Sequence, residues 1–177
     1  MQWNRSNTIG LAQISCCCCH GYGVRLVRKG KEVPCQCVLR AIFRACYNRF
    51  RDCALKAGQT PSVSLEFCRG KEAGWTYSRK REEFMADFCL VSRRTLDGLE
   101  YRIFKSHFLL GADWKLCCRQ LGLERGTFFH AVYRIQQKLG RTFAELEPFP
   151  LYPLDDYFGG MARKQSPPLS VQLPLAA

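Results

Sequence analysis

Histidine and the common catalytic motifs are scarce in this chain. It holds three histidines, far apart in the sequence, and contains no G-x-S-x-G, H-E-x-x-H or P-loop sequence. These motifs mark the nucleophile of hydrolases, the zinc site of metalloproteases and the phosphate loop of nucleotide-binding enzymes. A cysteine nucleophile such as Cys117 has no sequence signal for a base beside it. We therefore expect a protein that is not an enzyme.

Long apolar runs are also missing. No window holds 18 uninterrupted apolar residues, so the sequence predicts no membrane span. Residues 1–15 lack the basic start and the apolar core of a secretory signal. Cysteine, by contrast, is abundant, with 12 among 177 residues. Because disulfide-rich proteins are usually secreted, these absences favour a reduced, cytoplasmic protein whose cysteines bind metal or pack in the core.

Charge is strongly one-sided. The chain has 27 Lys and Arg against 15 Asp and Glu, which gives a net charge of +12. Basic residues dominate 36–56 and 100–141, whereas 142–160 holds four acids and no base. A basic body points to a polyanion, most often nucleic acid, although ribosomal, membrane-surface and merely soluble proteins are also basic.

Two pairs of cysteines have the spacing of a metal site. Cys16 and Cys19 form C-x-x-C-x-G-x-G, and Cys35 and Cys37 follow after 15 intervening residues. Residues 24–33 between the pairs have the pattern of a short β-hairpin, which would return the second pair to the first. Four thiolates about 2.3 Å from one Zn²⁺ make a closed, structural site. The pattern therefore predicts one structural zinc ion held by these four cysteines.

Other interpretations of the cysteines stay open at this point. Four consecutive cysteines could match by chance or form a disulfide cluster, and several further donors lie near enough to substitute as ligands: Cys17, Cys18, His20 and Cys46. The block resembles the zinc hairpins of J-domain chaperones and of the late antiterminators of lambdoid phages. It departs from them in its second half, where Cys35-Gln36-Cys37 is C-x-C and no glycines follow. The resemblance implies a zinc-bound hairpin and, from the antiterminators, a role in transcription.

The fold class predicted is mainly α, with a small N-terminal zinc-bound β-hairpin, long helices and a C-terminal three-helix helix-turn-helix. Apolar periodicity predicts helices over 36–57, 78–92, 99–110, 114–121 and 125–139. Six segments result: an uninformative start (1–15), the zinc hairpin with a long helix (16–57), a connecting loop and helix (58–95), the helix-turn-helix (96–141), an aromatic acidic segment (142–160) and a disordered tail (161–177).

Residues 96–141 have the layout of a helix-turn-helix. Asp113 is a credible N-cap for the helix 114–121, and Gly122-Leu123-Glu124 makes the turn before a longer helix. The longer helix carries one apolar stripe, made by Phe128, Val132, Ile135 and Leu139. The sequence Leu-Gly-Leu-Glu-Arg-Gly-Thr-Phe at 121–128 resembles the core of region four of bacterial sigma factors and of related response-regulator domains.

That resemblance implies that the longer helix enters the DNA major groove by its N-terminal residues. Carried over by position, the DNA-facing residues are Arg125, Thr127, His130 and Arg134. Phe129 and Ala131 depart from the polar residues usual there, so Phe129 either contacts thymine methyl groups or packs on another part of this protein. Arg40 and Arg44, on the polar side of the helix 36–57, are expected to contact the phosphate backbone.

The segment 142–160 is rich in aromatics and prolines. Pro148, Pro150 and Pro153 prevent a continuous helix, and five aromatic residues are too many for a solvated linker. The segment either packs back across the basic body or docks on a partner. Packing back is the interpretation that we favour, since its four acids face a basic body.

Together these features predict a zinc-containing, DNA-binding transcription regulator of sigma-like or antiterminator-like type. Double-stranded DNA is its expected partner, and RNA polymerase is a second one. The first alternative is a protein-interaction module in which the hairpin and the aromatic segment dock on RNA polymerase or another machine. A further alternative is an RNA-binding protein that uses the basic helix over 36–56.

Overall fold

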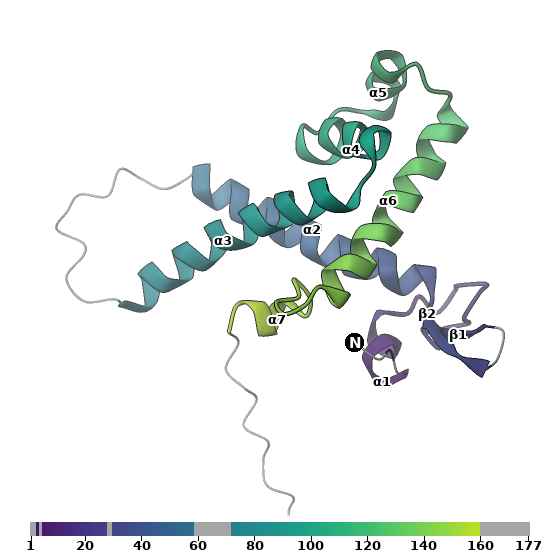
Figure 1. Cartoon of the computed structure of the whole chain (residues 1–177), viewed down its shortest axis with the longest axis horizontal. Helices are drawn as coiled ribbons and strands as arrows, with labels where there is room; N and C mark the ends of the chain where they lie inside the picture. Colours follow the sequence, from purple (N-terminus) through teal and green to yellow (C-terminus); the bar gives the residue numbers. More distant parts are fainter. Residues whose placement is uncertain (1–2, 4, 28–29, 59–71, 160–177) are drawn as a thin grey trace, which may run out of the picture.

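Helices make up most of the structure. The computed structural model describes residues 3, 5–27, 30–58 and 72–159. The elements in order are α1 (Arg5–Thr8), the 3-10 turn η1 (Ile9–Leu11), β1 (Val24–Leu26), β2 (Glu32–Pro34), α2 (Gln36–Gly58), α3 (Glu72–Thr95), α4 (Gly98–Phe104), the π-helical stretch η4 (Lys105–Leu109), α5 (Trp114–Leu121), α6 (Arg125–Glu145) and α7 (Leu154–Tyr157). The prediction of a mainly α protein with an N-terminal hairpin and long helices is confirmed (Figure 1).

The crossing of α2 and α6 forms the centre of the core. Helix α2 packs more extensively against α6 than against any other element among the described residues. At the crossing, Gly140 of α6 meets the backbone of Leu39: an added Cβ would lie 2.7 Å from the Leu39 carbonyl carbon and closer still to its oxygen. The bare glycine therefore lets the two helices approach closely. The stripe predicted on α6 is buried as expected, at Phe128, Val132, Ile135 and Leu139.

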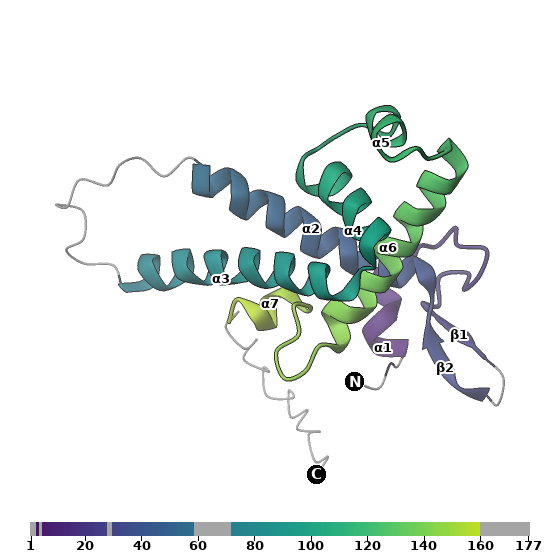
Figure 2. The same cartoon turned by 45° about the horizontal axis from the view of Figure 1, so that its top comes forward.

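Helix α3 lies beside α2, as Figure 2 shows. Phe88 of α3 stacks on Phe50 of α2, with their ring centroids 4.6 Å apart. Helix α3 begins at Glu72, six residues earlier than predicted, and α6 runs without a break to Glu145 instead of ending at 139. Both corrections have the same reason, because the predicted limits followed the clearest apolar repeats and helices continue beyond such repeats. No described helix is both long and apolar enough to cross a bilayer.

Five of the six predicted segments lie partly or wholly outside the described residues. The residues not described are 1–2 and 4 of the start, 28–29 of the hairpin segment, 59–71 of the connecting segment, 160 of the aromatic acidic segment and the whole tail 161–177. Within the described residues, each predicted helical region is helical, and α5 has the predicted bounds.

The helix-turn-helix layout is present in α5 and α6. The Asp113 carboxylate accepts a hydrogen bond from the Leu116 amide (2.7 Å) and caps α5 as predicted. Gly122 ends α5 in the left-handed conformation, with φ of 63°, which glycine adopts without strain. Helix α6 then starts at Arg125, after the three-residue turn.

A buried carboxylate joins α4 to α6. Glu100 keeps only 5 % of its side chain exposed, and its Oε2 accepts a hydrogen bond from Lys138 Nζ at 2.6 Å. Arg134 Nε lies 3.8 Å from the other oxygen, Oε1. Glu100 also belongs to the capping box of α4, in which its amide donates to Asp97 Oδ1. A buried charge needs this compensation, so the cluster fixes α4 against α6.

Removing the closer of these two cations should weaken the fold. We expect Lys138→Met, which keeps the apolar stem, to lower the free energy of unfolding by about 1–3 kcal/mol, because Glu100 stays buried with Arg134 alone beside it. Urea unfolding measures the loss, and Arg141→Met, at an exposed site on the same helix, serves as the control. A Lys138→Met variant as stable as the control would contradict the assigned role of the cluster.

The aromatic acidic segment packs back on the body. Leu151 is buried, and its amide donates to the Phe143 carbonyl at 2.9 Å. Tyr157 and Phe158 pack on Phe84 of α3, and the Tyr157 hydroxyl donates to Asp87 at 2.7 Å. This confirms the favoured interpretation of the segment. It also includes a short helix, α7, which the prolines had not indicated.

The start of the chain closes one end of the bundle. The Trp3 indole N–H donates to Glu145 at the end of α6 (2.6 Å). Thr8 is buried, and Leu11 and Ala12 pack against the core. Residues before Cys16 therefore brace the hairpin and α6 together, although no periodic pattern indicated this.

Candidate metal centre and basic surface

The hairpin brings the two cysteine pairs together. Cys16 and Cys19 lie in a tight turn in which the His20 amide donates to the Cys16 carbonyl. Cys35 follows β2 directly, Cys37 lies in the first turn of α2, and the Cys35 amide donates to the Gly23 carbonyl at 2.8 Å. Strands β1 and β2 pair in antiparallel register between the two pairs. The predicted return of the second pair to the first is therefore present.

The four sulfurs form one compact group, which we call the metal centre (Cys16, Cys19, Cys35 and Cys37). All four Sγ atoms lie within 4.8 Å of one another. Cys16 and Cys35 are 3.8 Å apart at sulfur, and Cys19 and Cys37 are 3.5 Å apart. Four thiolates at tetrahedral corners, about 2.3 Å from a zinc ion, are separated by about 3.8 Å. The arrangement is thus compatible with a tetrahedral metal site.

The other potential donors do not join the centre. Among the described residues, Cys17 and Cys18 are exposed and lie 3.9 Å from each other at sulfur. His20 is exposed as well. Cys46 is buried further along α2, where its thiol points to the Leu151 carbonyl. All of these cysteines are free thiols, so a disulfide cluster is not what the fold builds.

The environment of each thiol sets how readily it ionises. The amide N–H groups of Cys18 and then Cys19 stabilise the thiolate of Cys16 and lower its pKa to about 6. Burial raises the pKa of Cys35 to about 12 and raises that of Cys37 as well. Buried thiols hold their protons unless a cation replaces them, and a divalent metal does so. The site therefore combines one ready thiolate with two that need a metal to ionise.

Glycine makes the turn beside the centre possible. Gly23 has φ of 76°, and an added Cβ would lie 2.7 Å from both the carbonyl oxygen and the hydroxyl of Thr8. Only glycine fits both the conformation and the space. The second glycine of C-x-x-C-x-G-x-G is thus explained by contact with the N-terminal segment.

The residues predicted to face DNA lie mostly on the surface of α6. Arg125, Thr127 and His130 are exposed within its first two turns. The Arg125 guanidinium lies 5.2 Å from the Trp114 ring and 5.8 Å from the Phe129 ring. Arg134 is exposed two turns later and pairs with Glu100, a role that its sequence position did not indicate.

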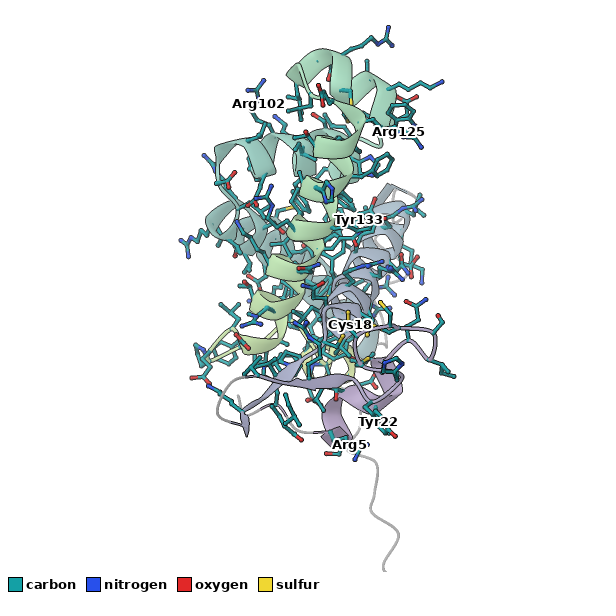
Figure 3. All side chains as sticks on the ribbon, turned by 90° about the vertical axis from the view of Figure 1, so that its right-hand side faces the viewer. Arg5, Cys18, Tyr22, Arg102, Arg125 and Tyr133 are labelled. Atoms are coloured by element: carbon teal, nitrogen blue, oxygen red, sulfur yellow. The ribbon has the colours of Figure 1, made fainter. Side chains whose placement is uncertain are left out.

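Helix α2 adds part of its basic side to the same surface. The Arg40 guanidinium lies 4.8 Å from the ring of Tyr133 on α6, whereas Arg44 is exposed. Figure 3 shows Arg125, Tyr133 and Cys18 along one face of the molecule, with the hairpin below them. The structure thus brings Arg40 to α6, and it keeps the metal centre apart from Arg125.

Phe129 and Ala131 pack on protein. Ala131 is buried, and Phe129 is half-buried against Trp114 and Phe128. Of the two options left open for Phe129, packing within the protein is the one seen. The part of α6 that could contact a DNA groove is therefore smaller than the whole helix face, because Phe129 and Ala131 do not belong to it.

Two further groups near the hairpin were missed from the sequence. The guanidinium of Arg5 lies 4.3 Å from the ring of Tyr22, and Arg25 lies on β1 beside them. The sequence around Arg5 and Arg25 has no periodic pattern, so it did not predict that these arginines would lie near Tyr22. The one available signal was Tyr22 itself, an aromatic residue between the glycines of the cysteine motif.

No family model, curated protein or solved structure matches the chain. The resemblances to zinc hairpins and to sigma region four therefore depend on their motifs alone.

Proposed function

We propose that this protein is a zinc-containing regulator of transcription that binds double-stranded DNA through the start of α6. The observation that carries the proposal is the exposed polar and basic surface at the first turns of α6, directly after a three-residue turn. Helix starts that follow such turns enter the major groove in helix-turn-helix proteins. Arg125, Thr127 and His130 are the side chains that would reach base edges.

The distribution of acids supports a polyanionic ligand. Of the three acids within 100–141, Glu100 is buried between basic side chains, whereas Asp113, which caps α5, and Glu124 are exposed. Arg102, Lys115 and Arg119 are exposed on the same segment. Exposed cations thus outnumber exposed acids here, and a positive surface attracts the DNA backbone.

Zinc is the metal that we assign to the four cysteines. Thiolate donors in tetrahedral arrangement suit Zn²⁺, and a site with four protein ligands leaves no open position for chemistry. Its role is to hold the hairpin on the start of α2. Arg40 lies three residues after Cys37 on that helix and reaches Tyr133, so the centre supports a helix that contributes to the basic surface.

Base readout and backbone contact should separate at Arg125 and Arg134. We expect Arg125→Ala to relax preference at one or two base pairs, since a residue that reads a base edge contributes about 1–3 kcal/mol of discrimination. Arg134→Ala should weaken binding to all sequences equally, as a phosphate contact does. Fluorescence anisotropy against a selected duplex and a scrambled duplex over a salt series measures both effects.

The same titration includes a control variant and shows which results would contradict the proposal. Arg79→Ala, at an exposed site on α3, should leave both affinities unchanged. For Arg134→Ala the salt dependence should become shallower by roughly 0.9 log-log units, the value for one phosphate that the protein no longer neutralises. Uniform weakening by Arg125→Ala would contradict base readout at this position. A flat salt response of the wild type would contradict the DNA-binding proposal as a whole.

A second candidate function has one observation in its favour. Large apolar side chains near the hairpin are exposed, among them Ile14 (89 %) and Leu26 (74 %). Such side chains suit contact with another protein, for which RNA polymerase is the candidate. Absence of binding to any nucleic acid at about 50 mM salt, where phosphate contacts are strong, would favour this function over the first.

A further inference from the structure

An open hollow lies beside the β1–β2 hairpin, next to the metal centre. Its volume is about 480 Å³, within the roughly 300–1,000 Å³ of small-ligand sites. The residues around it come from α1, the cysteine turn and both strands, and include Arg5, His20, Tyr22, Arg25, Leu26 and Glu32. The DNA-binding proposal for α6 uses none of these side chains.

Tyr22 forms an aromatic wall of this hollow. The residue is 54 % exposed, and the Arg5 guanidinium lies 4.3 Å from its ring centroid. Figure 3 shows Arg5 and Tyr22 together at one end of the molecule. An exposed aromatic ring beside an arginine is the composition on which unpaired bases stack.

Arg25 supplies a second arginine to the hollow. It lies on β1, lines the hollow and is half-buried. A phosphate oxygen is a strong acceptor for an arginine guanidinium. His20 adds a second donor at the rim of the hollow, and the Glu32 carboxylate adds an acceptor.

We propose that the hollow binds one unpaired nucleotide of a nucleic-acid strand. The base stacks on Tyr22, its phosphate pairs with Arg25 and Arg5, and Glu32 accepts from an exocyclic amino group. Val24 and Leu26 line the same hollow, and apolar walls suit a base better than a free phosphate. Because two arginines face one carboxylate, the hollow favours a negatively charged nucleic-acid strand over a peptide of low charge.

The hollow is separate from the duplex surface of α6, and its proposed role does not depend on that surface. Gly140, which meets Leu39 near the metal centre, lies 15 residues along α6 from Arg125. At 1.5 Å per residue this is about 22 Å, or roughly six to seven base pairs at 3.4 Å each. Arg125 and Tyr22 also lie on the face that Figure 3 presents. One nucleic acid could therefore meet both surfaces.

Short single strands test the proposal on the full, zinc-loaded chain. The probes are fluorescent oligodeoxycytidine and oligoribocytidine of eight nucleotides, with anisotropy as the readout. We expect Tyr22→Ala to weaken binding about 5- to 100-fold, the range for loss of one stacked base, while Tyr22→Phe keeps the ring and the affinity. Arg25→Gln should weaken binding as well, and Arg79→Gln on α3 should not. Tighter binding of the ribose probe would identify RNA as the source of the strand, and tighter binding of the deoxyribose probe would identify DNA; either supports the hollow.

Three results would overturn the proposal: no binding of either probe by the wild type, equal binding by wild type and Tyr22→Ala, or loss of single-strand binding by Arg125→Ala instead. Zinc content and thermal melting of each variant show that the hairpin is intact. Because Arg125→Ala affects the duplex surface and Tyr22→Ala the hollow, failure of one proposal leaves the other measurable.

Discussion

Replacing Cys16 and Cys19 together by serine should abolish metal binding and loosen the first third of the chain. The two sulfurs contribute half of the metal centre, and Cys35 and Cys37 alone cannot complete a closed site. Structural zinc supplies about 10–16 kcal/mol in small zinc-binding peptides, far more than a two-stranded hairpin gains by its own pairing. We expect zinc content to fall from about one ion per chain to none. Amide hydrogen exchange should rise across residues 12–37.

The exposed neighbours provide a matched control for this result. Cys17→Ser with Cys18→Ser removes two thiols from the same turn, yet both side chains lie outside the centre. That variant should keep its zinc and its slow exchange. The core of α2 and α6 should persist in both variants, since Phe43 and Ile135 are buried without any contribution from the metal. Unchanged zinc in the Cys16 and Cys19 variant would disprove the assigned ligand set.

Gly140→Ala should be among the most destabilising single changes in the protein. Its new methyl group would collide with the Leu39 carbonyl, which belongs to backbone that cannot rotate away. Overpacking typically costs 1–3 kcal/mol and more where backbone must shift, so we expect a loss of about 3 kcal/mol or more. Urea unfolding followed by circular dichroism measures it.

The direction of the stability change distinguishes a steric clash at Gly140 from the ordinary effect of replacing glycine in a helix. Alanine normally stabilises a helix relative to glycine by up to about 1 kcal/mol. Gly126, on the same helix, has nothing within 4 Å of an added Cβ, so Gly126→Ala should leave the stability unchanged or raise it slightly. Equal responses at the two glycines would show that α2 and α6 do not cross as closely as described.

Local patterns were sufficient for part of this fold. The buried stripe of α6, the Asp113 cap and the left-handed Gly122 each follow from residues within a few positions of one another. The clustering of the four cysteines was also predictable, because the residues of a potential metal site share both a residue type and a limited spacing. Such features are encoded over short distances, where periodicity and turn chemistry act.

Contacts between distant segments could not be predicted in the same way. Trp3 contacts Glu145, Gly23 contacts Thr8 and Gly140 contacts Leu39. In none of these pairs does the sequence around one residue indicate which residue it will contact. The burial of Glu100 has the same origin, since a glutamate in an amphipathic helix ordinarily faces water. Recognising these contacts requires knowing how the helices cross, which a single sequence does not state.

The hydrogen bond between Trp3 and Glu145 affects the order in which parts of this protein can fold during synthesis. The four clustered cysteines all lie within residues 16–37, so the hairpin can bring them together early in synthesis. Glu145 follows Cys37 by 108 residues, which takes roughly 5–20 s at 5–20 residues per second. Throughout that interval the hairpin exists without the helix on which its N-terminal flank docks. A zinc ion at these cysteines, as proposed, would therefore be an early tertiary restraint of the nascent chain, whereas the contact between Trp3 and Glu145 can form only much later.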